Sequence, residues 1–459
     1  MNLRKVSALA SVAVLAFAAC SSTGSTTPSP AASSGGGASS PAASSGGAAS
    51  PGASSGGALT PSTPKPAGDT SKGTATIAIE LPQQGSEKAA SDPIINGIKL
   101  AVKLAGGTAG GYKLDIPQSA IYDDALNGAH DPQTGANNMT KIVSDADVVA
   151  VVGPLNSGVA RAQIPISNEA GLLQCSPANT GTDLTKPPDS AKYRPAGKPN
   201  NYIRVVTTDD IQGPAASQYD YETLGKKSVY IIDDTEAFGK PVADNFEKDF
   251  KARGGNVVKH DAAPKTTQDY VSIMTAAKAL NPESIYFGGV TATGGARILL
   301  AAQQVGLGDV PFIGPDGIND GSGATKDSFL NLGGPAAKNA YSTLAGPGTF
   351  DQKDKFDADY KAEYGIDATG YAGQGFACTQ VILDAIGRAA PADKASAREA
   401  IRAAGTATDH TYKLIVGDVT FDANGDTSQH IVSIYSFDPQ GAGGKGNWKF
   451  DTQVDYTAK

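Results

Sequence analysis

The chain has 459 residues, of which 55 are Gly and 28 are Pro, and its formal net charge is −8. Residues 21–68 contain only Ser, Thr, Gly, Ala and Pro, apart from Leu59 and Lys65, so this stretch cannot bury enough apolar surface to fold. About 390 residues remain, which is enough for two lobes that each have a core. Lys and Arg form no visible cluster, and this disfavours a nucleic-acid partner.

The first twenty residues have the pattern of a bacterial lipoprotein signal peptide. Arg4 and Lys5 are followed by an apolar run of 14 residues and then by Cys20. This run is too short to cross a bilayer core, which takes about 20 helical residues, but it suits the apolar segment of a signal peptide. Residues 17–20 resemble the lipobox, although Phe17 stands where most lipoproteins have Leu. We predict lipidation at Cys20; the alternative is a plain secretory peptide with an incidental cysteine.

The segment after this cysteine is predicted to be a disordered tether over residues 21–70. As a flexible coil it would hold the folded part at a root-mean-square distance of roughly 35–40 Å from the lipid. The protein is therefore expected on the extracytoplasmic side of the cell membrane, held there by its lipid anchor.

From residue 74 onward, short apolar runs alternate with amphipathic stretches. They predict strands at 75–81, 148–152, 228–232, 284–287 and 310–313, and helices at 92–104, 137–145, 237–252, 269–280 and 294–305. Continuous apolar strands separated by helices indicate parallel sheets covered on both faces, that is, an α/β fold. Near the C-terminus, antiparallel strands are predicted at 415–421, 431–437 and 447–454, with turns at 422–426 and 440–446.

Motifs for catalysis or metal binding are lacking. The four histidines have no metal-ligand spacing, and we predict solvated loop or strand positions for His130, His260, His410 and His430. The sequence has no P-loop and no nucleophile elbow, and the glycine-rich residues 441–446 lie between two predicted strands, which indicates a turn. We therefore predict a protein that is not an enzyme and that has no metal site and no other cofactor.

Two cysteines remain after the lipid cysteine. In an exported domain such residues often pair, so one prediction is a disulfide between Cys175 and Cys378. The other is two separate buried thiols, one at a strand end and one in a helix.

Seven stretches together resemble the substrate-binding proteins of branched-chain amino acid ABC transporters, which have the periplasmic-binding-protein type I fold. They occur in the family's order and span nearly all of residues 74–437. The stretches are AVVGPLNSG at 150–158, CSPANT at 175–180, YIRVV at 202–206 with DIQG at 210–213, IIDDTEAFG at 231–239, YFGG at 286–289, FIGPDG at 312–317 and FDANG at 421–425.

This resemblance implies two doubly wound parallel-sheet lobes, joined by a hinge of three crossovers, with a ligand in the cleft. Lobe 1 would hold residues 74–205 and 345–427, and lobe 2 would hold residues 206–344 and 428–459. The ligand would lie at the carboxyl ends of the strands, as in other open α/β sheets.

The family's ligand site transfers to five residues. Ser157 matches the serine that binds the ligand carboxylate at the start of a helix, where backbone N–H groups also favour an anion. Ala178 and Thr180 match residues whose carbonyl and hydroxyl hold the carboxylate and ammonium. Asp316 matches the acid that faces the ammonium, and Phe238 matches an aromatic cover from lobe 2.

Each of these residues also has a simpler interpretation. Ser157 and Thr180 suit helix N-caps, Asp316 in Pro-Asp-Gly suits a turn, and Phe238 suits the core.

Two departures from the family pattern concern the ligand. Ala90 and Val290 occupy positions that are tyrosines in well-studied amino-acid binders, and residues 186–201 are an insertion beside the cleft strand. The pocket is therefore expected to be larger or reshaped. An amino acid is the first expectation, and amides, urea-like compounds and aromatic carboxylates are the alternatives.

The function implied is that of a monomeric solute receptor. It would close around a small ligand, most simply a branched-chain or other amino acid, and deliver it to the permease subunits of an ABC transporter. A sensor of the same fold that signals to a membrane partner is the alternative, because both functions need only closure. An exported enzyme is disfavoured because no set of nucleophile, base and orienting group is present.

Overall fold

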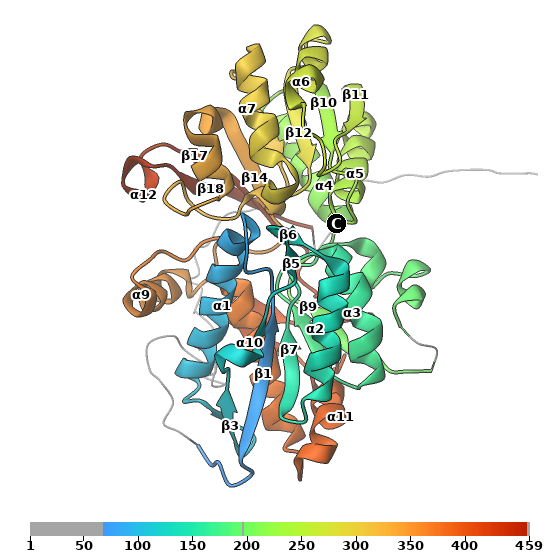
Figure 1. Ribbon diagram of the computed structural model, residues 1–459, viewed down its shortest axis with the longest axis vertical. Coiled ribbons are helices and arrows are strands. Elements are labelled where there is room, and N and C mark those ends of the chain that lie inside the picture. Colours follow the sequence, from blue (N-terminus) through green and yellow to red (C-terminus); the bar gives the residue numbers. More distant parts are fainter. Residues whose placement is uncertain (1–67, 195–196, 457–459) are drawn as a thin grey trace, which may run out of the picture. The chain divides into compact units, whose positions relative to one another are not determined.

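The computed structural model describes residues 68–194 and 197–456. The predicted signal peptide with Cys20, and the predicted tether up to residue 67, lie outside the described residues. Among the residues described, no helix is long and apolar enough to cross a membrane. The fold has two lobes, each built on a seven-stranded sheet with helices on both faces (Figure 1).

The first sheet has the strand order β2-β3-β1-β7-β8-β9, and β4 pairs with β1. Its pairs are parallel except for β2 with β3. The strands are β1 (Thr74–Glu80), β2 (Thr108–Ala109), β3 (Tyr112–Asp115), β4 (Ile121–Tyr122), β7 (Val148–Val152), β8 (Leu173–Ser176) and β9 (Tyr202–Arg204). The helices of this lobe are α1 (Glu87–Leu104), α2 (Pro132–Ser144), α3 (Ser157–Glu169), α9 (Lys353–Tyr364), α10 (Ala372–Ala389) and α11 (Lys394–Gly405).

The second sheet has the order β11-β10-β12-β13-β14-β17-β18, in which β14 with β17 and β17 with β18 are antiparallel. The strands are β10 (Ser228–Asp233), β11 (Asn256–Ala262), β12 (Ser284–Gly288), β13 (Phe312–Gly314), β14 (Ala340–Leu344), β17 (Ile431–Asp438) and β18 (Asn447–Asp455). The helices are α4 (Asp209–Gln218), α5 (Gly239–Ala252), α6 (Tyr270–Ala279), α7 (Gly295–Val305), α8 (Phe329–Gly333) and the short α12 (Gly441–Gly444).

Alternate residues of each central strand face opposite helices, because successive side chains of a strand point to opposite faces. In β1, Ile77 and Ile79 join a cluster with α1 and α10, whereas Ala78 packs with Met139 and Ile142 of α2. The central strand β10 alternates in the same way between α5 on one face and α6 on the other. Both sheets are therefore buried on both faces, and the predicted α/β fold is confirmed.

The chain passes between the two sheets three times. The first passage runs from β9, which ends at Arg204, to α4, which begins at Asp209. The second follows β14, which ends at Leu344, and leads to α9, α10 and α11, of which α10 packs against α1. The third precedes β17, which begins at Ile431. Segments distant in the sequence thus complete each lobe.

One predicted C-terminal strand is wrong. Residues 415–421 do not form a single strand, because β15 (Tyr412–Leu414) and β16 (Gly417–Val419) pair as a small antiparallel hairpin. Gly417 has a φ of 110°, a conformation that glycine adopts easily and that lets the chain turn there. By contrast, β17 and β18 pair antiparallel as predicted, and the glycine-rich segment forms the connection between them.

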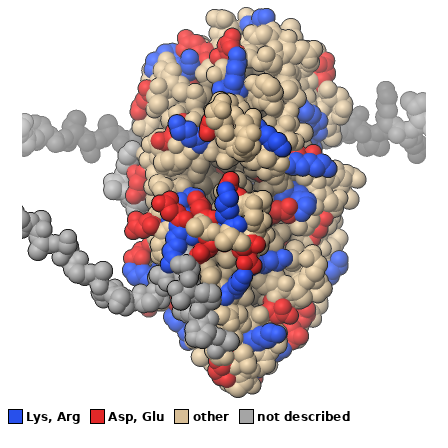
Figure 2. All heavy atoms as spheres, turned by 90° about the vertical axis from the view of Figure 1, so that its left-hand side faces the viewer, with Lys and Arg blue, Asp and Glu red and all other residues tan. Residues whose placement is uncertain are grey.

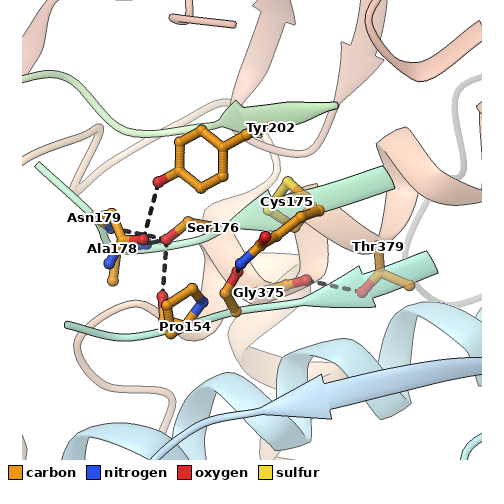
Figure 3. Close-up of a disulfide and its surroundings, with 11 residues drawn as sticks. Pro154, Cys175, Ser176, Ala178, Asn179, Tyr202, Gly375 and Thr379 are labelled. Carbon is orange, nitrogen blue, oxygen red and sulfur yellow. Dashed lines mark hydrogen bonds between the residues drawn. A yellow bond between two sulfur atoms is a disulfide. The ribbon is translucent and has the colours of Figure 1, made fainter. Parts of the chain in front are cut away.

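A disulfide joins Cys175 of β8 to Cys378 of α10, with Cα atoms 5.7 Å apart (Figure 3). Both residues are fully buried, and 203 positions separate them in the sequence. Of the two arrangements left open above, the structure has the bonded one. It fixes the start of the loop after β8 to a helix from the last third of the chain.

Charged side chains of both signs are intermixed on the face shown in Figure 2, without an extended basic patch there. Among the described residues, several exposed ion pairs lie one helical turn apart, such as Lys88 with Asp92 and Lys240 with Asp244. Exposed pairs of this kind add little stability, so the folding energy resides mainly in the two cores.

Candidate ligand-binding site

A cavity is lined by loops of both lobes. These loops follow the carboxyl ends of β7, β8, β10, β12 and β13, and they are joined by the start of α1 and by residues 369–371 before α10. Open α/β sheets bind ligands at this end of their strands. The cavity is therefore the candidate site.

All five residues predicted from the family motifs line this one cavity. Ser157, Ala178 and Thr180 reach it from the first lobe, and Phe238 and Asp316 reach it from the second. Ala90 and Val290, the two departures from the family pattern, line it as well. The structure thus brings together residues that lie up to 226 positions apart, Ala90 to Asp316.

The loops after β7 and β8 are held together by hydrogen bonds (Figure 3). The hydroxyl of Ser176 donates to the carbonyl of Pro154 and accepts from the backbone N–H of Ala178 and Asn179. The hydroxyl of Ser157 accepts from the backbone N–H of Gly181 at 3.1 Å. This network, next to the disulfide, fixes where Ala178 and Ser157 lie in the cavity wall.

Arg204 holds the loop after β8 in place through hydrogen bonds from its side chain. Its side chain is fully buried, and it donates to the carbonyls of Asn179 and Gly181 at 3.2 and 2.8 Å. Its Nε donates to the carboxylate of Asp426 at 2.7 Å, and Thr185 bridges the two charged groups. A buried guanidinium with this many partners orients the backbone on both sides of Thr180.

Asp316 lines the cavity from the loop after β13. Its Oδ2 accepts a hydrogen bond from the hydroxyl of Tyr371 at 2.7 Å, while its Oδ1 is buried and has no hydrogen-bond partner among the described residues. Burial raises the pKa of Asp316 to about 6, and burial likewise raises the pKa of nearby Asp209 to about 8. An unpaired buried carboxylate oxygen indicates a cationic or hydrogen-bond-donating ligand group.

The lining also includes Glu87, one member of a buried ion pair that the sequence did not predict. Glu87, the first residue of α1, accepts hydrogen bonds from the backbone and ring nitrogens of His130 at 2.6 and 2.8 Å, and from Asn156 at 2.7 Å. Burial opposes the charge of both groups, yet each favours the other's charge, so the pKa of Glu87 is lowered and the pKa of His130 is raised. The prediction of a solvated His130 is wrong, because β6 (Ala129–His130) packs against the start of α1.

Asp320 and Thr291 also line the cavity and were missed by the sequence analysis. The Oδ1 of Asp320 accepts from the backbone N–H of Phe329 at 2.8 Å, while its Oδ2 and the hydroxyl of Thr291 have no hydrogen-bond partner among the described residues. Burial raises the pKa of Asp320 to about 7. A sequence signal existed, because Asp320 lies only four positions after Asp316 in the loop that follows one strand.

The simpler interpretations of the site residues were two helix N-caps, a turn and a core position. Asn156, not Ser157, is the N-cap of α3, and Thr180 precedes a short 3-10 turn without capping a helix. Phe238 is only partly buried and lines the cavity, so it is not a core residue. Asp316 does begin a single 3-10 turn, and its carboxylate lines the cavity as well.

A second polar cluster lies away from the cavity, on α5 and β11. Ligand-type atoms of Asp244, Glu247 and His260 lie within 4.8 Å of one another. Lys240 already pairs with Asp244, and Lys251 pairs with Glu247, so the charges of these acids are balanced by lysines. His260 itself is ion-paired and partly buried, which contradicts the predicted solvated position.

The model of the family described as periplasmic binding protein matches residues 74–444. The Leu/Ile/Val-binding protein BraC3 of Rhizobium johnstonii is 29% identical over 369 residues, which cover 79% of this chain and 91% of the relative. The leucine-, isoleucine-, valine-, threonine-, and alanine-binding protein of Pseudomonas aeruginosa is 26% identical over 374 residues, with 81% and 91% of the two chains covered.

A solved structure has the same fold. The crystal structure of a leucine-binding protein from Thermotoga maritima aligns with a TM-score of 0.69 at 24% identity, and covers 83% of this chain and 99% of that chain. These similarities confirm the two-lobed type I fold, and they confirm the expectation of a binding protein rather than an enzyme.

Proposed function

This chain belongs to the periplasmic binding protein family, and from that premise we propose that it captures an amino acid between its two lobes and delivers it to an ABC transporter permease. The observation that carries the proposal is the meeting of Ser157, Ala178, Thr180, Phe238 and Asp316 at one cavity. In this assignment Ser157 and the first turn of α3 hold the ligand carboxylate, where the helix N-terminus favours an anion. Thr180 and Asp316 hold the ammonium, and Phe238 covers the ligand.

The proposal includes closure of the two lobes around the ligand. The first lobe would comprise residues 74–205 and 345–427, the second would comprise residues 206–344 and 428–459, and the three passages between them would form the hinge. Contacts across the cleft support it: the hydroxyl of Tyr371 reaches Asp316, and Arg161 donates to the carbonyl of Ala237 at 3.1 Å. Because the ligand's partners are divided between the lobes, its full binding energy is available only in the closed state.

Ligand titration with the full chain tests this function. A panel of L-amino acids with neutral and charged side chains should include at least one that raises the melting temperature, since a ligand at 100 times its Kd adds about 2.7 kcal/mol of stability. Small-angle scattering with that ligand should show a smaller radius of gyration. Absence of any amino-acid response, with benzoate, acetamide and urea as the comparison ligands, would refute the amino-acid assignment.

A lipid anchor at Cys20 belongs to the same proposal, with the folded part working as a monomer at the outer face of the membrane. Its support is the short apolar run that ends in Ala-Ala-Cys. Replacement Cys20→Ser should release the protein from membranes into the soluble fraction of cells that express it. A Phe17→Leu variant, which restores the common lipobox residue, is the matched control and should stay in the membrane fraction. Equal membrane association of Cys20→Ser and the unmodified chain would contradict the anchor.

A further inference from the structure

The cavity has more unpaired acceptors than donors. Three buried groups in its lining that can only accept lack a hydrogen-bond partner among the described residues: Oδ1 of Asn156, Oδ1 of Asp316 and Oδ2 of Asp320. The hydroxyl of Thr291 also has no partner there, but it can donate as well as accept. Among the described lining residues, one buried donor nitrogen also lacks a hydrogen-bond partner, Nδ2 of Asn319. Buried polar groups in native proteins almost always have partners, so these oxygens indicate the chemistry of what fills the cavity.

The charged residues of the cavity lining are all acidic, which agrees with its excess of unpaired acceptors. Three carboxyl groups, Glu87, Asp316 and Asp320, face the cavity, and no Lys or Arg is among its described lining residues. Glu87 is balanced by His130 behind it. Asp316 is assigned above to the α-ammonium of the ligand, so the carboxylate of Asp320 remains without a counter-charge.

Asp320 shares the lining with two other buried polar residues, Asn156 and Thr291. Asn156 donates its amide N–H to Glu87, and this leaves its Oδ1 as a free acceptor. The hydroxyl of Thr291 lies close enough to Asp320 to favour its charged form and so to lower its pKa, whereas the negative charge of Glu87 raises that pKa. Asp320, Asn156 and Thr291 are each more than nine-tenths buried, at 4%, 6% and 6% exposure. Because Phe329 fixes the other oxygen of Asp320, its Oδ2 is held in place and is not free to turn towards solvent.

We propose that Asp320, Asn156 and Thr291 form a side-chain subsite for a ligand with a cationic nitrogen, so that the captured amino acid is a basic one such as lysine, ornithine or arginine. This inference rests on the function proposed above and names its ligand class. The ammonium or guanidinium of the side chain pairs with Asp320, and its other N–H groups donate to Asn156 and Thr291. Charge-assisted hydrogen bonds in a desolvated site are the strong ones, so they dominate selectivity.

The apolar part of the lining fits the same ligand. Ala90, Val290, Pro93 and Leu155 line the cavity with small or aliphatic side chains. The methylene stem of a basic amino acid can lie along such surface while its charged end reaches an acid. A short branched aliphatic side chain would instead leave Asp320 buried and unpaired, which is costly.

Calorimetric titration of the full chain with L-lysine, L-arginine, L-ornithine, L-norleucine and L-leucine tests the proposal. Norleucine has the lysine stem without the ammonium, so the pair isolates the contribution of the side-chain charge. We expect at least one basic amino acid to bind more than tenfold more tightly than norleucine and leucine. Equal or tighter binding of the neutral ligands would overturn the subsite but leave the proposed function intact, whereas binding of none of the five at millimolar concentration would count against both.

Variants of the subsite separate its role from folding. Asp320→Asn keeps an oxygen that can accept from the backbone N–H of Phe329. It should abolish most of the preference for the basic ligand over norleucine, because the basic ligand loses its counter-charge and norleucine no longer leaves a buried carboxylate unpaired. Thr291→Val should reduce the same preference less. If Asp320→Asn lowers affinity for basic and neutral ligands equally, the residue is structural and the subsite is refuted. Should Asp320→Asn fail to fold, as judged by circular dichroism, the ligand preference of the unmodified chain and of Thr291→Val decides.

Discussion

Replacement Asp316→Asn should weaken binding of an amino acid by well over tenfold. In the proposed site the carboxylate of Asp316 pairs with the ligand ammonium, and its Oδ1 is buried without a partner among the described residues. Removing one member of a desolvated charge pair leaves the other charge uncompensated, which costs on the order of 2–5 kcal/mol, and tenfold in Kd corresponds to about 1.4 kcal/mol. Calorimetric titration with the best ligand of the amino-acid panel measures the change.

The matched control for this variant is Tyr371→Phe. It removes the hydroxyl that donates to Oδ2 of Asp316 but keeps the carboxylate, so affinity should fall much less. If Asp316→Asn binds as tightly as the unmodified chain, Asp316 serves only its 3-10 turn. The ammonium would then be held by Thr180 and the carbonyl of Ala178.

The pH dependence of ligand binding should also arise from the carboxyl group of Asp316. Burial raises the pKa of Asp316 to about 6, so the group is increasingly protonated below that pH and increasingly charged above it. The ammonium of the ligand stays charged throughout this range. Affinity should therefore rise as the pH increases from 5 to 7, and the rise should be smaller in Asp316→Asn. An affinity that is independent of pH in the unmodified chain would contradict this role.

Replacement Arg204→Met should lower the free energy of unfolding by about 3–5 kcal/mol, because it leaves Asp426 buried without its counter-charge. The Nη1 of Arg204 also holds the carbonyls on both sides of Thr180, so ligand affinity should fall with stability. Urea denaturation followed by circular dichroism measures the first effect, and calorimetry measures the second.

The double variant Arg204→Met/Asp426→Leu is the control for Arg204→Met. It removes both charges of the buried pair and should recover part of the lost stability, since a buried pair is often replaceable by apolar residues. Its ligand affinity should stay low, because the carbonyls of Asn179 and Gly181 still lack their donor. A single variant as stable as the unmodified chain would show that the ion pair does not contribute to folding.

The sequence by itself determined the fold class and the positions of the main strands. The apolar runs at 148–152 and 284–287 became β7 and β12 because continuous burial on both faces requires continuous apolar residues, and this pattern is local. Boundaries were less accurate. The helix predicted at 137–145 begins at Pro132, where Asp131 caps it by accepting from the backbone N–H of Thr134, a signal that the apolar spacing does not contain.

Only the tertiary structure decided which polar residues meet. Ser157 and Asp316 were found from motifs, but Glu87, His130 and Asp320 carry no motif, and their roles depend on loops from different strands meeting at one cavity. The sequence also left the pairing of Cys175 with Cys378 open. This disulfide requires β8 and α10 to be neighbours, although 203 positions separate the two cysteines. Local patterns set burial and secondary structure, whereas the charge and hydrogen-bond balance of the site depends on long-range packing that spacing along the chain does not encode.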